Sequence, residues 1–272
     1  MSQAPYVPAE YLTKLWRALI EFHMLAPGDK LLIGLSGGKD SMFLTAALAE
    51  VQRHSPAPFD LACYTVDTMF SPEFPAAELT AFCARYGLKH YHDQVNVNEV
   101  WHKRGNTPCF SCAYFRRAAT NRRARELGFN KVVLAHHNDD AVDTFLLNLL
   151  NSGQLKTFLP VTYLSRTGLT VLRPLIYYRE AEIIVYGQKI GLKPLKNPCP
   201  YDGNTQRQEM KELLASLSKK NPELYAHLAS AMRQSKEQEL WPEKLSQEAS
   251  LLIFRDFWQK KKQNSLCIKR KY

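Results

Sequence analysis

The sequence is informative first for what it lacks. No apolar run approaches the roughly 20 residues that a helix needs to cross a bilayer. The first eight residues, Met1 to Pro8, do not show the charged and then apolar layout of a signal peptide. The sequence also has no internal repeat and no low-complexity segment. We therefore expect a globular protein of the cytoplasm without a membrane partner.

Acidic side chains are scarce. The 272 residues include 26 Asp and Glu against 36 Lys and Arg, which gives a formal net charge of +10. This excess predicts a polyanionic partner, for which nucleic acid is the leading candidate and an anionic membrane surface the alternative. The length is sufficient for one large α/β domain with helical additions.

The long Gly-x-x-x-x-Gly-Lys spacing of the Walker loop is missing as well, but a different glycine loop is present. Ser36-Gly-Gly-Lys-Asp-Ser41 follows an apolar run, Leu31 to Leu35, and precedes a predicted helix from Ser41 through Glu50. Apolar residues without alternation indicate a strand that is buried on both faces, as in a parallel sheet. The loop is thus expected between a buried strand and the first turn of a helix.

The residue types of this loop suit phosphate. Gly37 and Gly38 have no Cβ, so the backbone can turn sharply and approach a ligand closely. The following helix directs its unpaired N–H groups and the positive end of its dipole at the turn. Lys39 adds a cation, and Asp40 adds a carboxylate suited to a magnesium ion. Hydroxyl groups flank them at Ser36 and Ser41, and we favour a phosphate site over an ordinary turn.

Strands and helices are predicted to alternate through most of the chain. The expected strands are Leu31 to Leu35, Phe59 to Val66, Lys89 to Asp93, Lys131 to Ala135 and Leu169 to Leu172. The expected helices are residues 10–24, 41–50, 78–86, 113–127, 136–150 and 179–190. This order predicts an α/β fold with a doubly wound parallel sheet, whose ligands bind at the carboxyl ends of the strands.

From Gln206 onward the pattern indicates helices alone. They are expected at residues 206–217, 224–236 and 244–258, and the chain closes on two basic runs. We therefore divide the chain into an N-terminal helical segment (1–28), a catalytic domain (29–205) and a basic helical C-terminal extension (206–272).

Polar residues follow two of the predicted strands. Asp67 ends the second strand, where its carboxylate could bind a ribose hydroxyl or assist a metal ion, although capping the next turn explains it equally well. His136-His-Asn-Asp-Asp140 follows the fourth strand and opens a helix. The helix dipole accounts for Asp139 and Asp140 but not for the paired histidines. Consecutive residues cannot all converge on one metal ion.

The six cysteines are expected to be reduced, and therefore to serve as core residues, metal ligands or catalytic thiols. Cys63 and Cys83 fall on predicted core positions, and Cys267 is expected to be an unpaired thiol near the C-terminus. Cys109-Phe-Ser-Cys112 together with Cys199 could hold a 4Fe-4S cluster with one open iron. A zinc site completed by His90, His92 or His102 and a redox disulfide between Cys109 and Cys112 are the alternatives.

Arginines gather on the helix that follows Cys112. A charged run on a helix is usually a solvated face, but here few acidic residues accompany it, and aromatic Tyr114 and Phe115 are interleaved. The combination favours contact with an RNA backbone and splayed bases. The candidate RNA-binding residues are Arg116, Arg117, Arg122 and Arg123.

The motifs, taken in order, resemble one family. Ser36-Gly-Gly-Lys-Asp-Ser41 resembles the loop of the PP-loop ATPases, and Ala135-His-His-x-Asp-Asp140 resembles their second signature. With Cys109-x-x-Cys112, Arg116-Arg117, Arg173-Pro-Leu175 and Pro198-Cys199, the pattern is similar to that of the TtcA-type tRNA-cytidine 2-sulfurtransferases. The resemblance spans about residues 14–212. One departure is Asp202, which stands where many members have a second cysteine after Cys199.

The resemblance implies a Rossmann-like PP-loop ATPase fold and the thiolation of a cytidine in the tRNA anticodon loop, with ATP, a magnesium ion and a 4Fe-4S cluster. It implies that Cys109, Cys112 and Cys199 hold the cluster, and that Asp40 and Asp139 hold the magnesium ion. His136 would join the loop and Asp67 in binding ATP. Lys39, Asp40, Asp139 and the three cysteines would be catalytic. The sulfur would come from a cysteine desulfurase or from sulfide, and relatives suggest a homodimer. Related enzymes thiolate uridine, and a lysidine-synthetase-like ligase or a zinc-bearing RNA-binding protein are the alternatives.

Overall fold

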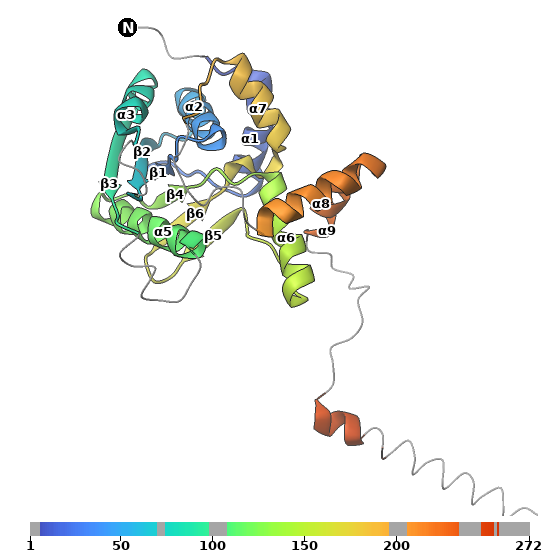
Figure 1. Ribbon diagram of the computed structural model, residues 1–272. Coiled ribbons are helices and arrows are strands. Elements are labelled where there is room, and N and C mark those ends of the chain that lie inside the picture. The colour runs from blue at the N-terminus through green and yellow to red at the C-terminus, as the bar shows by residue number, and fades with distance from the viewer. Residues whose placement is uncertain are drawn as a thin grey trace, which may run out of the picture. The chain divides into compact units, whose positions relative to one another are not determined.

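The computed structural model of the chain describes residues 6–69, 74–97, 108–195, 206–233, 246–252 and 255 (Figure 1). The chain divides into two compact units, residues 1–233 and 234–272. In the second unit, residues 247–252 are helical, within the helix expected there from the sequence. Across the described residues, no helix is both long enough and apolar enough to span a bilayer.

The first unit is built on a six-stranded sheet with the order β3-β2-β1-β4-β6-β5. The strands are β1 (Lys30–Gly34), β2 (Asp60–Asp67), β3 (Lys89–Gln94), β4 (Lys131–Val133), β5 (Val161–Leu164) and β6 (Leu169–Leu172). All neighbouring pairs are parallel except β5 and β6, which are antiparallel with Val161 opposite Leu172. The predicted doubly wound parallel sheet is therefore confirmed, with one antiparallel edge strand added.

Strand β5 was not predicted. It has only four residues, and Tyr163 on it is largely exposed, so its apolar signal is weak. The run Leu169–Leu172 was recognised alone because it is buried, whereas its partner lies across the turn that ends at Gly168, with φ +70°. Two short β-favouring runs separated by a glycine-containing turn are the signature of a hairpin, and that signal was available in the sequence.

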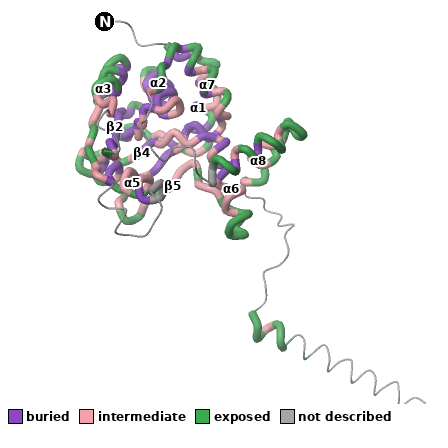
Figure 2. Tube along the Cα trace, in the orientation of Figure 1, coloured by how far each residue is buried: buried purple, intermediate pink, exposed green. Residues whose placement is uncertain are grey.

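Helices cover the two faces of the sheet unequally (Figures 1 and 2). The helices are α1 (Ala9–Glu21), α2 (Lys39–His54), α3 (Ala76–Arg85), α5 (Pro108–Glu126), α6 (Asn138–Ser152) and α7 (Glu180–Lys189), with a 3-10 turn, η1 (Pro174–Tyr177). Helices α1, α2, α3 and α7 share a large core with one face of the sheet. Helix α5 packs on the other face through Ala119 and Ala124.

Strand β1 shows why its apolar run does not alternate. Leu31 and Ile33 belong to the large core under α2, and Leu32 belongs to the smaller core under α5. Successive side chains of a strand point to opposite faces, so a strand covered on both faces needs apolar residues at every position. The carboxyl end of β1 is thereby held firmly, and the loop that follows it starts from a fixed point.

Two further helices, α8 (Gln206–Lys220) and α9 (Leu224–Ala231), pack against α6. Met210 and Leu214 of α8 are buried with Val142 of α6 in a small third core. The first part of the expected C-terminal extension is thus joined to the α/β unit by apolar burial. The boundaries at residues 28/29 and 205/206 stay predictions.

Candidate active site

The glycine loop after β1 has the geometry that its sequence predicts for an anion cradle. Gly37 has φ +83°, a backbone conformation that residues with a Cβ rarely adopt, and its carbonyl accepts the Leu195 N–H at 2.9 Å. Helix α2 begins at Lys39, two residues earlier than predicted, with Gly38 as its N-cap. The Ser36 and Ser41 hydroxyl oxygens lie 3.1 Å apart. These groups point the unpaired N–H groups of α2 at the loop.

The second polar run lies beside this loop because β1 and β4 are neighbours in the sheet. The connections from β1 and β4 leave toward opposite edges, which makes their carboxyl ends the switch point of the fold. The backbone N–H of His137, the N-cap of α6, donates to Asp140 Oδ2 at 3.0 Å. The buried His137 ring lies 3.8 Å from Asp40 Oδ1 and 3.5 Å from Asp140 Oδ2.

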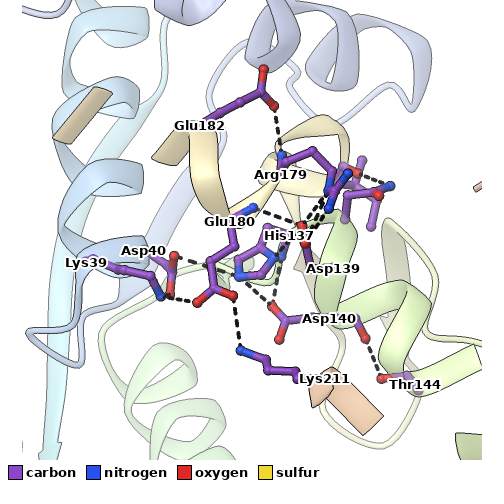
Figure 3. Close-up of polar contacts among 12 residues, drawn as sticks. Lys39, Asp40, His137, Asp139, Asp140, Thr144, Arg179, Glu180, Glu182 and Lys211 are labelled. Atoms are coloured by element: carbon purple, nitrogen blue, oxygen red, sulfur yellow. Dashed lines mark hydrogen bonds and ion pairs between the residues drawn. The ribbon is translucent and has the colours of Figure 1, made fainter. Parts of the chain in front are cut away.

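Lys39 is held by two carboxylates, one of which comes from a helix far along the chain (Figure 3). Its Nζ lies 3.0 Å from Asp40 Oδ2 and 2.8 Å from Glu180 Oε1. Glu180 starts α7, and its second oxygen lies 3.2 Å from Lys211 Nζ on α8. Glu180 therefore bridges the lysine of the loop and a lysine of the C-terminal helices.

This bridge determines the charge states of its members. Burial alone would lower the pKa of Lys39, but hydrogen bonds and charge attraction from Glu180 and Asp40 outweigh it, and the pKa is raised. Burial likewise opposes ionisation of Glu180, yet Lys39 and Lys211 lower the pKa of its carboxyl to about 2. At neutral pH the loop therefore presents a firmly protonated lysine held by a firmly ionised glutamate.

The carboxylates of Asp139 and Asp40 differ in how far they are already engaged. Asp139 accepts hydrogen bonds from the Arg179 guanidinium at 3.1 to 3.2 Å and from the Glu180 N–H at 2.9 Å. Arg179 in turn lies over the Tyr225 ring of α9, 3.4 Å from its centroid. Asp40 Oδ1 is buried and has no hydrogen-bond partner among the described residues. A buried carboxylate oxygen without a donor suits a cation, so Asp40 fits the expected magnesium ion better than Asp139 does.

A cavity of about 1150 Å³ joins the loop to the face of the sheet under α5. From the loop, Ser36, Asp40 and Ser41 line it, and His136 and Asp140 line it from the end of β4. From α5, Ala113, Tyr114, Arg116, Arg117 and Arg122 line it. The described residues thus bring the loop, the second polar run and three of the four predicted RNA-binding arginines to one space.

The fourth predicted arginine, Arg123, does not line the cavity. Its guanidinium lies 3.3 Å from Glu126, 3.8 Å from Asp93, and over the Tyr91 ring at 5.8 Å from the centroid. These contacts hold α5 against β3, so the geometry gives Arg123 a packing partner and leaves its RNA contact a prediction.

The predicted cysteine site is only partly described. Cys112 is half-buried on α5, one residue before the cavity-lining Ala113, whereas the side chain of Cys109 and all of Cys199 lie outside the described residues. Among the described residues, no three His, Cys, Asp or Glu side chains gather in a metal site. Leu195, which donates to Gly37, is the last described residue before Cys199, so the segment that carries Cys199 starts at the loop.

Several other predicted positions have clear surroundings. Cys63 and Cys83 are fully buried in the large core, as expected, and Cys267 lies outside the described residues. Asp67 accepts the Met69 N–H at 2.8 Å and the Gln94 amide at 3.1 Å, which matches the turn-capping explanation. Its binding of ATP stays a prediction. Both ring nitrogens of His90 lie 2.9 Å from threonine hydroxyls, and burial lowers its pKa to about 4.

Sequence reasoning missed Arg179, Glu180 and Lys211. Arg179-Glu180 precedes a helix, where an acidic residue is expected for its dipole alone, and nothing local connects it to the glycine loop. The only signal was its place soon after Arg173-Pro-Leu175, which marks the end of the sixth strand. His137 and Asp140 were seen within their motif, but not as a capping pair.

Comparisons with known proteins agree with this geometry. Residues 11–217 match the PP-loop domain. The chain is 33% identical over 221 residues to the tRNA-cytidine(32) 2-sulfurtransferase of Geobacter metallireducens, covering 79% of this chain and 86% of the relative. It is 35% identical over 221 residues to the tRNA-cytidine(32) 2-sulfurtransferase of Xanthomonas axonopodis pv. citri, covering 79% and 72%.

Among solved structures, the U34-tRNA thiolase NcsA from Methanococcus maripaludis, determined with its 4Fe-4S cluster, is similar with a TM-score of 0.70 at 22% identity. The match covers 86% of this chain and 82% of that chain. At this identity, the likeness establishes a common fold.

Proposed function

We propose that this chain, which belongs to the PP-loop family and within it to the tRNA-cytidine 2-sulfurtransferases, activates a tRNA pyrimidine with ATP and replaces its 2-oxygen with sulfur. The proposed base is a cytidine of the anticodon loop, because the relatives are named for that substrate. One observation carries the proposal. The glycine loop and the part of α5 that directly follows Cys112 line the same cavity.

The loop supports a role in ATP binding. The N-terminus of α2, the Gly37–Gly38 turn and protonated Lys39 are suited to phosphate groups. Asp40, with its buried and unpartnered Oδ1, would hold a magnesium ion, which would neutralise charge on the phosphates. Asp139 would assist by fixing Arg179 and the first turn of α7.

The reaction we propose has two steps. The 2-oxygen of the base attacks the α-phosphate of ATP, and pyrophosphate leaves. Sulfide then attacks C2 and expels AMP, so that the oxygen departs with AMP and sulfur remains on the base. Lys39 and the N–H groups of α2 stabilise the charge that develops on the phosphate oxygens, which is the main catalytic need in such transfers.

A 4Fe-4S cluster, when bound, would supply a binding site for the sulfur atom. Its proposed ligands are Cys109, Cys112 and Cys199, in a sequence where Cys112 immediately precedes cavity-lining residues. Arg116, Arg117 and Arg122 would contact the RNA backbone, and the flipped base would enter the cavity. A cysteine desulfurase or free sulfide as the sulfur donor and a homodimeric assembly remain further expectations.

The test uses the full chain, purified without oxygen. With ATP, magnesium, sulfide and tRNA, we expect 2-thiocytidine in the digested tRNA by mass spectrometry, and pyrophosphate release only when tRNA is present. Cys112→Ser should abolish thiolation and reduce bound iron. A matched control is Cys63→Ser in the core, which should keep iron and lose only stability. Full thiolation by colourless, iron-free protein would contradict the cluster, and activity of Cys112→Ser with an amine would favour a ligase instead.

A further inference from the structure

Arg173 is the residue of the sequence motifs that the proposed reaction leaves without a role. It directly follows β6, so it lies at the carboxyl edge of the sheet, where the loop also lies. It lines the cavity together with Ser36 and His136. An arginine at the wall of a substrate cavity is either a structural brace or a binding group.

Part of the Arg173 side chain serves as a brace. Its Nη1 donates to the Leu159 carbonyl at 2.7 Å and to the Thr162 hydroxyl at 3.1 Å. The guanidinium also lies over the Phe158 ring, 5.0 Å from the centroid, and Phe158 contacts His136 with 5.2 Å between the rings. These contacts aim the guanidinium but use few of its five N–H donors.

The rest of the guanidinium has no counterpart in the protein. Arg173 Nε is buried without a hydrogen-bond partner among the described residues. No carboxylate of the described residues contributes to its charge state: burial lowers its pKa to about 10, and the second cause is Arg117. Two guanidinium groups of like charge therefore face one another across a partly buried space. Such an arrangement is unfavourable until an anion enters.

The cavity as a whole has the same imbalance. Its arginines are Arg116, Arg117, Arg122, Arg125, Arg166 and Arg173. Its acidic residues are already engaged: Asp40 with Lys39, Glu126 with Arg122 and Arg123, and Asp140 with the His137 N–H. The surplus of positive charge predicts an anionic ligand beyond the cation-binding carboxylate of the loop.

We propose that Arg173 and Arg117 form a subsite for one phosphodiester group of the RNA substrate. This rests on the proposed function. Strand β4 lies between β1 and β6, so two strand spacings of about 4.8 Å, or roughly 10 Å, separate the loop from the start of the Arg173 side chain. The ATP phosphates have their own cradle at the loop, whereas Arg117 belongs to the arginine-bearing helix proposed to grip RNA. A forked guanidinium pair suits a phosphodiester, which presents two acceptor oxygens.

The first experiment compares Arg173→Gln with the wild-type full chain in tRNA binding and in ATP binding. Gln keeps a donor for the Leu159 carbonyl but removes the charge. We expect the Kd for tRNA to rise about 10- to 100-fold, and the Kd for a non-hydrolysable ATP analogue with magnesium, measured without tRNA, to change less than twofold. Arg85→Gln on α3 removes the same charge away from the cavity and should change neither value.

The second experiment tests whether both arginines hold one phosphate. The logarithm of the tRNA binding constant falls linearly with the logarithm of salt concentration, with a slope of about 0.7 to 0.9 per phosphate contacted. Arg117→Gln, which breaks no hydrogen bond or ion pair among the described residues, and Arg173→Gln should each reduce the slope by about that amount. The double variant should reduce it no further, because the same contact is already lost. Thermal unfolding of each variant separates this from loss of the brace.

The outcomes are distinct. If the wild-type chain thiolates tRNA but Arg173→Gln binds it as tightly as the wild type, the subsite is refuted and the proposed function stands. Weaker ATP binding with unchanged tRNA binding would assign the anion to ATP and overturn the RNA subsite. A drop in thermal stability with an unchanged salt slope would leave Arg173 as a brace only. A wild-type chain that neither binds nor thiolates tRNA would instead overturn the proposed function.

Discussion

The two faces of the central sheet have been given different tasks. On one face, α2 packs with α1, α3 and α7 into a large core, where Phe43, Leu44 and Leu48 are fully buried. On the other face, α5 buries only a small cluster and leaves a cavity lined by arginines and by the glycine loop. Packing on the first face fixes the ends of the strands, and open space on the second uses those fixed ends. Stability and chemistry should therefore respond to different substitutions.

The largest expected effect breaks the packed face. Phe43 is fully buried and lies 5.6 Å from the Tyr178 ring and 6.1 Å from the Tyr186 ring, between centroids. Phe43→Ala should lower the free energy of unfolding by about 3–5 kcal/mol, measured by urea denaturation. Thiolation per folded molecule should stay unchanged. The matched change on the other face, Arg122→Gln, should alter stability by less than about 1 kcal/mol and weaken tRNA binding. Equal stability losses on both faces would refute the division.

The next effect breaks the loop. Lys39→Met keeps the aliphatic stem and removes the charge that we assign to the phosphates. We expect kcat/KM for ATP in tRNA-dependent pyrophosphate release to fall by about 10²- to 10³-fold, the usual cost of one preorganised donor. Lys156→Met, an equal change at an exposed position away from the cavity, should leave the rate unaltered. A Lys39→Met enzyme with normal kcat/KM would exclude the loop as the ATP site.

How much of this division can be read from the sequence depends on how local its causes are. The loop, the buried strand β1 and the arginines of α5 are encoded by neighbouring residues, and all three were predicted. The partner of Lys39 was not, because Glu180 reaches it only through the packing of α7 on α2. Arg123 resembles Arg122 in sequence, yet one braces β3 and the other lines the cavity. That difference is set by the rotation of α5, which no local pattern specifies.

A smaller effect sharpens the comparison within the site itself. Glu180 acts through Lys39, so Glu180→Gln should reduce kcat about tenfold, equivalent to about 1.4 kcal/mol, with a smaller change in the KM for ATP. Glu182→Gln is the matched control, because Glu182 begins the same helix but pairs with Lys14 on α1. It should reduce stability without changing kcat. Equal kcat values for both variants would make Glu180 a structural residue.

The smallest effect concerns pH, and it separates the site from the edge of the sheet. The pKa of Glu180 falls from 4.5 to about 2 because Lys39 and Lys211 outweigh burial. Its contribution to stability is therefore complete above pH 4.5 and is lost as the pH falls from 4.5 toward 2. Burial lowers the pKa of His90 from 6.5 to about 4, so its contribution is lost earlier, between pH 6.5 and 4. Urea denaturation across this range should show that Glu180→Gln removes only the lower transition and that His90→Gln removes only the upper one. If Glu180→Gln instead flattened the loss between pH 6.5 and 5, the ionised bridge to Lys39 would not be present in solution.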